Sequence, residues 1–172
     1  RISFVKQLNE IIYDIHKKLS GGKEELEIVY EPDVSMEDYE RSLTLSQERD
    51  IKLKMTSTGP HRDDFSFMVR KMDSNETVDI RKFGSQGQQR TAALSLKLSE
   101  IELVKKLTKD TPLLLLDDVL SELDSNRQNY LLNSIGGIQT IITCTGLDEF
   151  VNNRFEINKV FRVVNGSIES EN

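Results

Sequence analysis

The sequence has few of the residues that stabilise small secreted domains. Cys144 is the one cysteine among 172 residues, which excludes an internal disulfide and a cysteine-based metal cluster. Long apolar runs are missing too: the longest, Leu113 to Leu116, is far shorter than the roughly 20 residues that cross a bilayer. No secretory leader is visible. These absences indicate a reducing compartment, so we expect a cytoplasmic protein without a membrane partner.

A phosphate-binding P-loop is a further absence. No segment matches G-x-x-x-x-G-K-[ST], and Gly22-Lys23 lacks both the preceding glycine and the following hydroxyl. A chain without this cradle for the α- and β-phosphates should bind ATP weakly by itself. The chain begins at Arg1 rather than at methionine, so we expect it to be part of a longer protein.

An excess of positive charge is also missing. The net charge is −6, which argues against DNA binding by bulk charge alone. The charge is unevenly distributed: residues 61–110 carry 10 basic and 8 acidic groups, whereas residues 1–60 and 111–172 are net acidic. Any contact with a phosphate backbone would therefore have to be local.

Hydrophobic periodicity and turn residues predict alternating helices and strands. The glycine pairs at 21–22 and 136–137 should end the helices before them, and Asn165-Gly166 should turn a final hairpin. A strand, a helix and a second strand in the last 60 or so residues predict a parallel sheet. The expected helices are 3–19, 35–51, 86–107 and 125–135, and the expected strands are 26–30, 65–69, 77–80, 113–116, 140–144, 160–164 and 167–169.

The most informative segment is an apolar strand followed by two carboxylates. Four leucines, Leu113 to Leu116, suit a strand buried on both faces, and Asp117 and Asp118 then lie where parallel sheets bind ligands. Magnesium needs only one carboxylate besides phosphate oxygens and waters. In this Walker B pattern, Asp117 would hold Mg²⁺, and Asp118 would orient or deprotonate the attacking water.

The residues after this strand continue the pattern. Ser121-Glu122-Leu123-Asp124 follows at once, with Arg127 and Leu131 beyond, and so long a spacing is specific. The same residues also predict a helix start. Either Asp124 or Ser125 could be the N-cap, with Gln128 completing a capping box with Ser125.

A second motif lies upstream, in Gly84-Ser85-Gln86-Gly87-Gln88-Gln89-Arg90. Ser85 and Gln88 have the spacing of a capping box at the start of a long helix, and a helix N-terminus suits phosphate. Gly87 would let backbone approach a ligand closely. An ordinary helix start is the alternative, and the Walker B pattern some 30 residues later favours the phosphate site.

The sequence of these motifs resembles that of the RecF family of bacterial recombinational-repair ATPases, which belongs to the ABC/SMC class of ATPase heads. The resemblance rests on residues 59–64 (Gly-Pro-His-Arg-Asp-Asp), 85–90 and 117–124, and it spans about residues 56–145. It implies an α/β fold in which residues 56–172 are the C-terminal part of an ABC-type head, a parallel sheet with flanking helices. Residues 1–55 would form a helical arm, or lobe II. For the arm, a solvated hairpin and a partner-binding role both stay open.

The resemblance also implies roles for the motif residues. Ser85, Gln86, Gly87 and Gln88 match the ABC signature loop, with Gln86 in place of its first glycine, and would contact ATP bound mainly to another subunit. Asp124 belongs to the D-loop, which crosses to the partner head near the nucleotide.

Two departures from ABC heads point to a slow ATPase. Asp118 stands where glutamate is usual, and the region that often holds a switch histidine reads Thr143-Cys144-Thr145, so Thr145 is the candidate for that position. His61 and Arg62 fit a polar site or a structural turn.

The function implied by the resemblance is an ATP-dependent clamp in repair of gapped DNA and replication-fork maintenance. ATP and Mg²⁺ would act in the full-length protein. The implied partners are DNA at single-strand/duplex junctions, RecR- and RecO-type mediator proteins, and a second copy in an ATP-dependent homodimer, all at the nucleoid. A non-catalytic dimerisation or DNA-binding module and another ABC-type ATPase are the alternatives.

Overall fold

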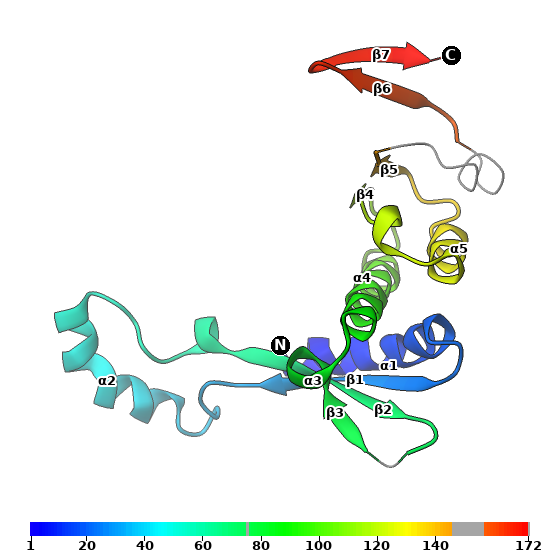
Figure 1. Ribbon diagram of the computed structural model, residues 1–172. Coiled ribbons are helices and arrows are strands. Elements are labelled where there is room, and N and C mark those ends of the chain that lie inside the picture. Colours follow the sequence, from blue (N-terminus) through cyan, green and yellow to red (C-terminus); the bar gives the residue numbers. More distant parts are fainter. Residues whose placement is uncertain (75, 146–156, 172) are drawn as a thin grey trace. The chain divides into compact units, whose positions relative to one another are not determined.

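The computed structural model describes residues 1–74, 76–145 and 157–171. It divides into two compact units, Arg1–Thr111 and Pro112–Asn172. Within the described residues, no helix is long and apolar enough to cross a membrane. The first unit contains α1 (Ile2–Leu19), β1 (Glu24–Glu31), α2 (Tyr39–Leu53), the 3₁₀ turn η1 (Pro60–Arg62), β2 (Asp64–Lys71), β3 (Thr77–Asp79), α3 (Ile80–Phe83) and α4 (Gln86–Thr108) (Figure 1).

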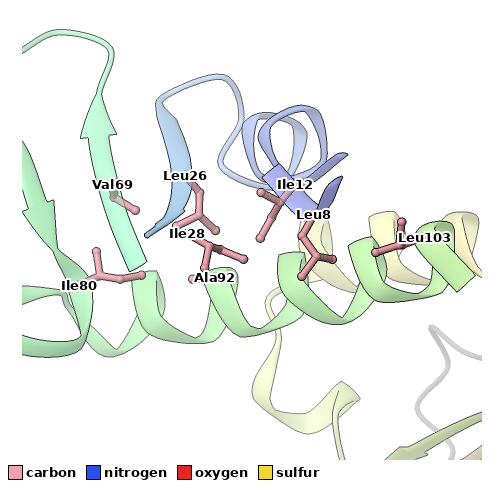
Figure 2. Close-up of a cluster of buried hydrophobic side chains, with 8 residues drawn as sticks. All are labelled: Leu8, Ile12, Leu26, Ile28, Val69, Ile80, Ala92 and Leu103. Atoms are coloured by element: carbon pink, nitrogen blue, oxygen red, sulfur yellow. The ribbon is translucent and has the colours of Figure 1, made fainter. Parts of the chain in front are cut away.

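The core of the first unit lies between an antiparallel sheet and two helices. The sheet has the order β1-β2-β3, and β1 pairs with β2 along its whole length, from Glu24↔Lys71 to Glu31↔Asp64. Helix α1 packs against both β1 and α4. Figure 2 shows the side chains that these elements bury together: Leu8 and Ile12 of α1, Leu26 and Ile28 of β1, Val69 of β2, Ile80 of α3, and Ala92 and Leu103 of α4.

Helix α1 forms as its apolar spacing predicts. Its buried face includes Leu8, Ile12, Ile15 and Leu19, three or four residues apart, and the helix ends at Leu19. Gly21 follows with φ 64°, a conformation that glycine adopts without steric cost. The predicted glycine stop is therefore confirmed.

The second unit contains a parallel strand pair and a hairpin. Its elements are β4 (Leu114–Asp117), the 3₁₀ turn η2 (Leu120–Glu122), α5 (Ser125–Ser134), β5 (Thr140–Thr143), β6 (Val160–Val164) and β7 (Ser167–Glu171). Strands β4 and β5 are parallel, with Leu114 opposite Thr140, which confirms the predicted parallel sheet. The hairpin turns at Asn165 (φ 50°) and Gly166 (φ 78°), also as predicted.

Burial of β4 differs from the prediction. Four consecutive leucines suggested a strand covered on both faces, but Leu115 is 68% exposed and its register partner Ile141 is 54% exposed. Leu114 and Leu116 are half-buried on the other face. The pair β4-β5 therefore leaves one apolar face open to solvent in this chain.

Several boundaries also differ. The third predicted strand ends at Asp79 rather than at residue 80, because Asp79 caps the short helix α3 by accepting from the Arg81 N–H at 3.0 Å. Helix α2 begins at Tyr39 rather than at Ser35, since Ser35 instead bonds Asp38 in the turn before the helix. The sequence also predicts a turn at residues 73–75, between the second and third strands, and residue 75 lies outside the described residues.

Residues of the predicted arm share a core with later parts of the chain. Strand β1 pairs with β2, and α1 packs on α4, so residues 2–31 belong to the same unit as 64–108. The assignment of residues 1–55 to an arm of the intact protein stays a prediction.

Candidate nucleotide site

Helix α4 begins at the turn formed by Ser85 to Gln88, here called the signature turn. The Ser85 Oγ accepts a hydrogen bond from the Gln88 N–H at 3.2 Å, and the Gln88 Oε1 accepts one from the Ser85 N–H at 2.9 Å. Both halves of the predicted capping box are therefore present. The capping box fixes the N-terminus of α4, where the helix dipole is positive.

The signature turn is open on its outer side. Ser85 and Gln86 are exposed, and a Cβ added to Gly87 would meet only the Ser85 Oγ, at 4.0 Å. The fold itself therefore does not require glycine at 87, which leaves room for a ligand close to the backbone. Gly84 is different, because a Cβ there would lie 2.5 Å from the Ile80 carbonyl oxygen. The sequence patterns did not single out this packing role of Gly84.

Gln88 uses both ends of its side-chain amide inside the first unit. Besides the capping bond of Oε1, its Nε2 donates to the Glu24 Oε1 of β1 at 2.8 Å. The role of Gln88 as a phosphate contact stays a prediction. In this structure its amide holds the turn rather than pointing to solvent.

The Walker B carboxylate lies at the end of β4, opposite the last residue of β5. Asp117 is in register with Thr143, and the Thr143 hydroxyl donates to the Asp117 Oδ1 at 2.5 Å. The same hydroxyl oxygen accepts from the Asp118 N–H at 3.1 Å. Thr143 therefore holds both acidic residues. Sequence reasoning missed it, because counting from the predicted strand starts at residues 113 and 140 places Cys144 opposite Asp117, whereas the observed register starts at Leu114 and Thr140.

Asp118 has an uncommon backbone conformation. Its φ is 49°, in the left-handed region where aspartate and asparagine are tolerated better than other side chains. Hydrogen bonds from its N–H to Thr143 and from the Ser121 hydroxyl to its carbonyl oxygen, at 2.9 Å, hold this conformation. Both Asp117 and Asp118 are exposed, so their carboxylates can meet a ligand from solvent.

Asp124 caps helix α5. Its Oδ1 accepts from the N–H groups of Asn126 and Arg127, each at 3.1 Å, and its Oδ2 pairs with the Arg127 guanidinium. These backbone hydrogen bonds, chiefly the one from Arg127, and the nearby guanidinium lower the pKa of the Asp124 carboxyl. The capping box predicted between Ser125 and Gln128 is wrong, because the Gln128 Nε2 donates to the Leu120 carbonyl oxygen instead.

The structure gives less support to the remaining candidate residues. Thr145 is exposed and lies two residues beyond β5. Among the residues that the structure describes, no group of three or more His, Cys, Asp or Glu side chains could hold a metal ion by itself. Asp117 alone still fits Mg²⁺, which binds one carboxylate together with phosphate oxygens and water.

His61 and Arg62 contact backbone in the turn that precedes them. The His61 ring nitrogen Nε2 lies 2.9 Å from the Thr56 carbonyl oxygen, and Arg62 donates to the Ser57 carbonyl oxygen at 3.0 Å. These contacts support a structural turn. Asp63 connects this turn to an earlier part of the chain, since its carboxylate accepts hydrogen bonds from the Tyr30 hydroxyl and from the Asp33 N–H.

Comparison with known proteins bears on the family. The chain is 63% identical over 169 residues to the DNA replication and repair protein RecF of Lachnoclostridium phytofermentans, and 60% identical over 172 residues to that of Lachnospira eligens. These matches cover 98% and 100% of this chain but 45% and 46% of the relatives. No family model matches the chain.

The chain belongs to the RecF family.

Solved structures agree with this assignment. A RecF structure described as the recombination mediator protein RecF-ATPrS in the RecFOR pathway matches with a TM-score of 0.73 and 34% identity. It covers 98% of this chain and 44% of the RecF chain. A structure of SMC ATPases matches with a TM-score of 0.57 at 16% identity, which supports the common fold of these ATPase heads. The chain thus spans about half the length of the RecF proteins it matches.

Proposed function

We propose that this chain supplies the signature turn, the Walker B strand and the D-loop of a RecF-type ATPase. The observation that carries the proposal is the signature turn, where a complete capping box presents an exposed serine and the N-terminus of a 23-residue helix. Solved RecF structures described as RecF-ATP and RecF-ATPrS, similar to nearly all of this chain, support ATP as the ligand.

The signature turn would act on ATP held by a second copy. The chain lacks a P-loop, so a phosphate at Ser85 and Gly87 would belong to a nucleotide gripped elsewhere. The positive end of the α4 dipole and the Ser85 hydroxyl suit the γ-phosphate of such a nucleotide. Two heads would then close on ATP, because ATP binds the closed state better than the open one.

The Walker B residues would act on the ATP that is bound by their own subunit, not on the ATP of the second copy. Asp117 would hold Mg²⁺ against the phosphates, and the metal would supply charge stabilisation of the phosphoryl oxygens. Asp118 would orient the attacking water or accept its proton. Aspartate is one methylene shorter than glutamate, so its carboxylate lies further from the water and hydrolysis would be slow. Slow hydrolysis suits a timer that releases DNA.

The complete protein would act as a clamp on gapped DNA. The relatives are DNA replication and repair proteins, and the solved RecF structures belong to the RecFOR pathway. These likenesses support binding at single-strand/duplex junctions and cooperation with RecR- and RecO-type mediators. The chain's net charge of −6 means that DNA contacts come from local basic patches or from residues outside this chain.

ATP-dependent dimerisation of the full-length protein tests this proposal. Ser85→Arg places bulk and charge at the signature turn, so the variant should bind ATP as a monomer but fail to dimerise in light scattering. Ser35→Arg makes the same change at another exposed serine and should dimerise normally. Dimerisation of Ser85→Arg at the ATP concentration that suffices for the parent would refute the trans role.

A further inference from the structure

The signature turn is connected to a buried histidine through two side chains. Gln88 of the turn donates from Nε2 to the Glu24 Oε1 at 2.8 Å, across 64 residues of sequence. The other oxygen of Glu24 lies 3.6 Å from the Nε2 of His16, which is fully buried in α1. This contact between α1 and β1 is an ion pair only in the protonated form of the imidazole.

His16 is itself held by helix α4. Its Nδ1 lies 2.9 Å from the Ser95 Oγ, and the Ser95 hydroxyl donates to the Thr91 carbonyl oxygen at 2.7 Å. One turn earlier, the Thr91 hydroxyl donates to the Gly87 carbonyl oxygen at 2.6 Å. This series of polar contacts therefore starts and ends on α4. Through it, α1 and β1 hold the first turns of this helix in place.

The partners of Gln88 specify which way its amide points. The Ser85 N–H is a donor and must face the amide oxygen, whereas the Glu24 carboxylate is an acceptor and must face the amide nitrogen. A glutamate at 88 could still accept from the Ser85 N–H, since Glu is as good a capping-box partner as Gln. Its second oxygen, however, would face the Glu24 carboxylate, and the two charges would repel.

We propose that Glu24 is a positioning residue for the nucleotide contact: acting through Gln88 and backed by His16, it fixes the signature turn in the geometry that receives the γ-phosphate. This inference rests on the proposed role of Ser85 and Gly87. It assigns Gln88 to holding the turn, because both ends of its amide are already engaged. Charge-assisted hydrogen bonds such as this part-buried one are stronger and more directional than neutral ones.

A charge exchange between the two residues tests the proposal in the full-length protein. The readout is the ATP concentration that gives half-maximal dimerisation. Gln88→Glu should raise it about tenfold, the effect of losing one hydrogen bond to a charged group. Glu24→Gln should raise it by less, because the new amide oxygen can still accept from Gln88 although the negative charge is lost. The double variant Glu24→Gln with Gln88→Glu should return to near the parent value, since the donor and acceptor have been exchanged.

Glu25 provides the matched control for a merely structural effect. It is the next residue of β1 and bonds Tyr13 and Arg70 instead of the signature turn. Glu25→Gln should lower the thermal unfolding midpoint without changing the ATP concentration for dimerisation. An unchanged ATP requirement in Gln88→Glu, or a double variant no better than Gln88→Glu alone, would overturn the positioning role.

The Ser85→Arg variant separates this inference from the proposed function. If Ser85→Arg fails to dimerise while Gln88→Glu behaves like the parent, the signature turn meets ATP but Glu24 does not position it. If Ser85→Arg dimerises normally, the trans role of the turn is wrong, and the positioning role is overturned with it.

Discussion

The Thr143 hydroxyl donates to the Asp117 Oδ1 at 2.5 Å and accepts from the Asp118 N–H at 3.1 Å, so one side chain orients both acidic residues of the Walker B strand. Parallel pairing of β4 with β5 creates this relationship, because it places Thr143 opposite Asp117. Outer partners of this kind fix the direction of a metal-binding carboxylate.

Thr143→Val should weaken the use of Mg²⁺ by the full-length protein. Valine keeps the shape of threonine but removes both hydrogen bonds, so the Mg²⁺ concentration for half-maximal ATP hydrolysis should rise about tenfold, the lower end of losses from such outer partners. Thr111→Val, at an exposed position before the strand, is the matched control, and Thr145→Val tests the other candidate threonine. The opposite pattern, with Thr145→Val impaired and Thr143→Val normal, would assign the role to Thr145.

Asp118→Asn should slow hydrolysis while leaving ATP binding and dimerisation intact. Asparagine tolerates the left-handed backbone at φ 49° and removes only the charge. Loss of a general base typically costs about 10²- to 10⁴-fold in rate, which single-turnover assays can measure. Asp118→Val instead forces a β-branched residue into this conformation and should lose about 1–3 kcal/mol of folding stability. Parent-like hydrolysis by Asp118→Asn would exclude Asp118 as the base.

The Asp63 carboxylate should make the stability of the protein depend on acidic pH. The Tyr30 hydroxyl, together with the Asp33 N–H and Arg1, lowers the pKa of Asp63. Its stabilising contribution is therefore complete above the ordinary carboxyl pKa of about 4 and is lost as pH falls through the lower folded value. Urea midpoints of the parent and Asp63→Asn should converge in that range. Glu37→Gln, at an exposed loop position, is the control. A difference in urea midpoint between the parent and Asp63→Asn that stays constant with pH would contradict the account.

The open face of β4 and β5 should make residues 1–172 self-associate when produced alone. Leu113, Leu115 and Ile141 are each more than half exposed, and such apolar faces and open sheet edges recruit other chains. Light scattering should detect a dimer that Leu115→Glu weakens. Leu45→Glu, at a 76% exposed position of α2, should not weaken it. A parent chain that stays monomeric at high concentration and binds no apolar dye would contradict this prediction.

Local patterns predicted much of the fold and part of the site. The capping box of Ser85 and Gln88 and the hairpin turn at Asn165-Gly166 need only neighbouring residues, so spacing sufficed to find them. The contact between Glu24 and Gln88 joins elements 64 residues apart, and no local signal indicates it. Thr143 likewise required the register of two strands, and the backbone of Asp118 depends on that same contact.

Subunit mixing tests the central claim, that the signature turn and the Walker B strand of one chain serve different nucleotides. Ser85→Ala and Asp118→Asn of the full-length protein should each hydrolyse ATP poorly alone. In a mixed dimer, one site combines Asp118 of the first variant with Ser85 of the second and is intact. Random pairing should therefore restore about a quarter of the parent rate, because about half of the dimers are mixed and each has one intact site of two. A mixture that hydrolyses ATP no faster than the average of the two separate variants would contradict the account.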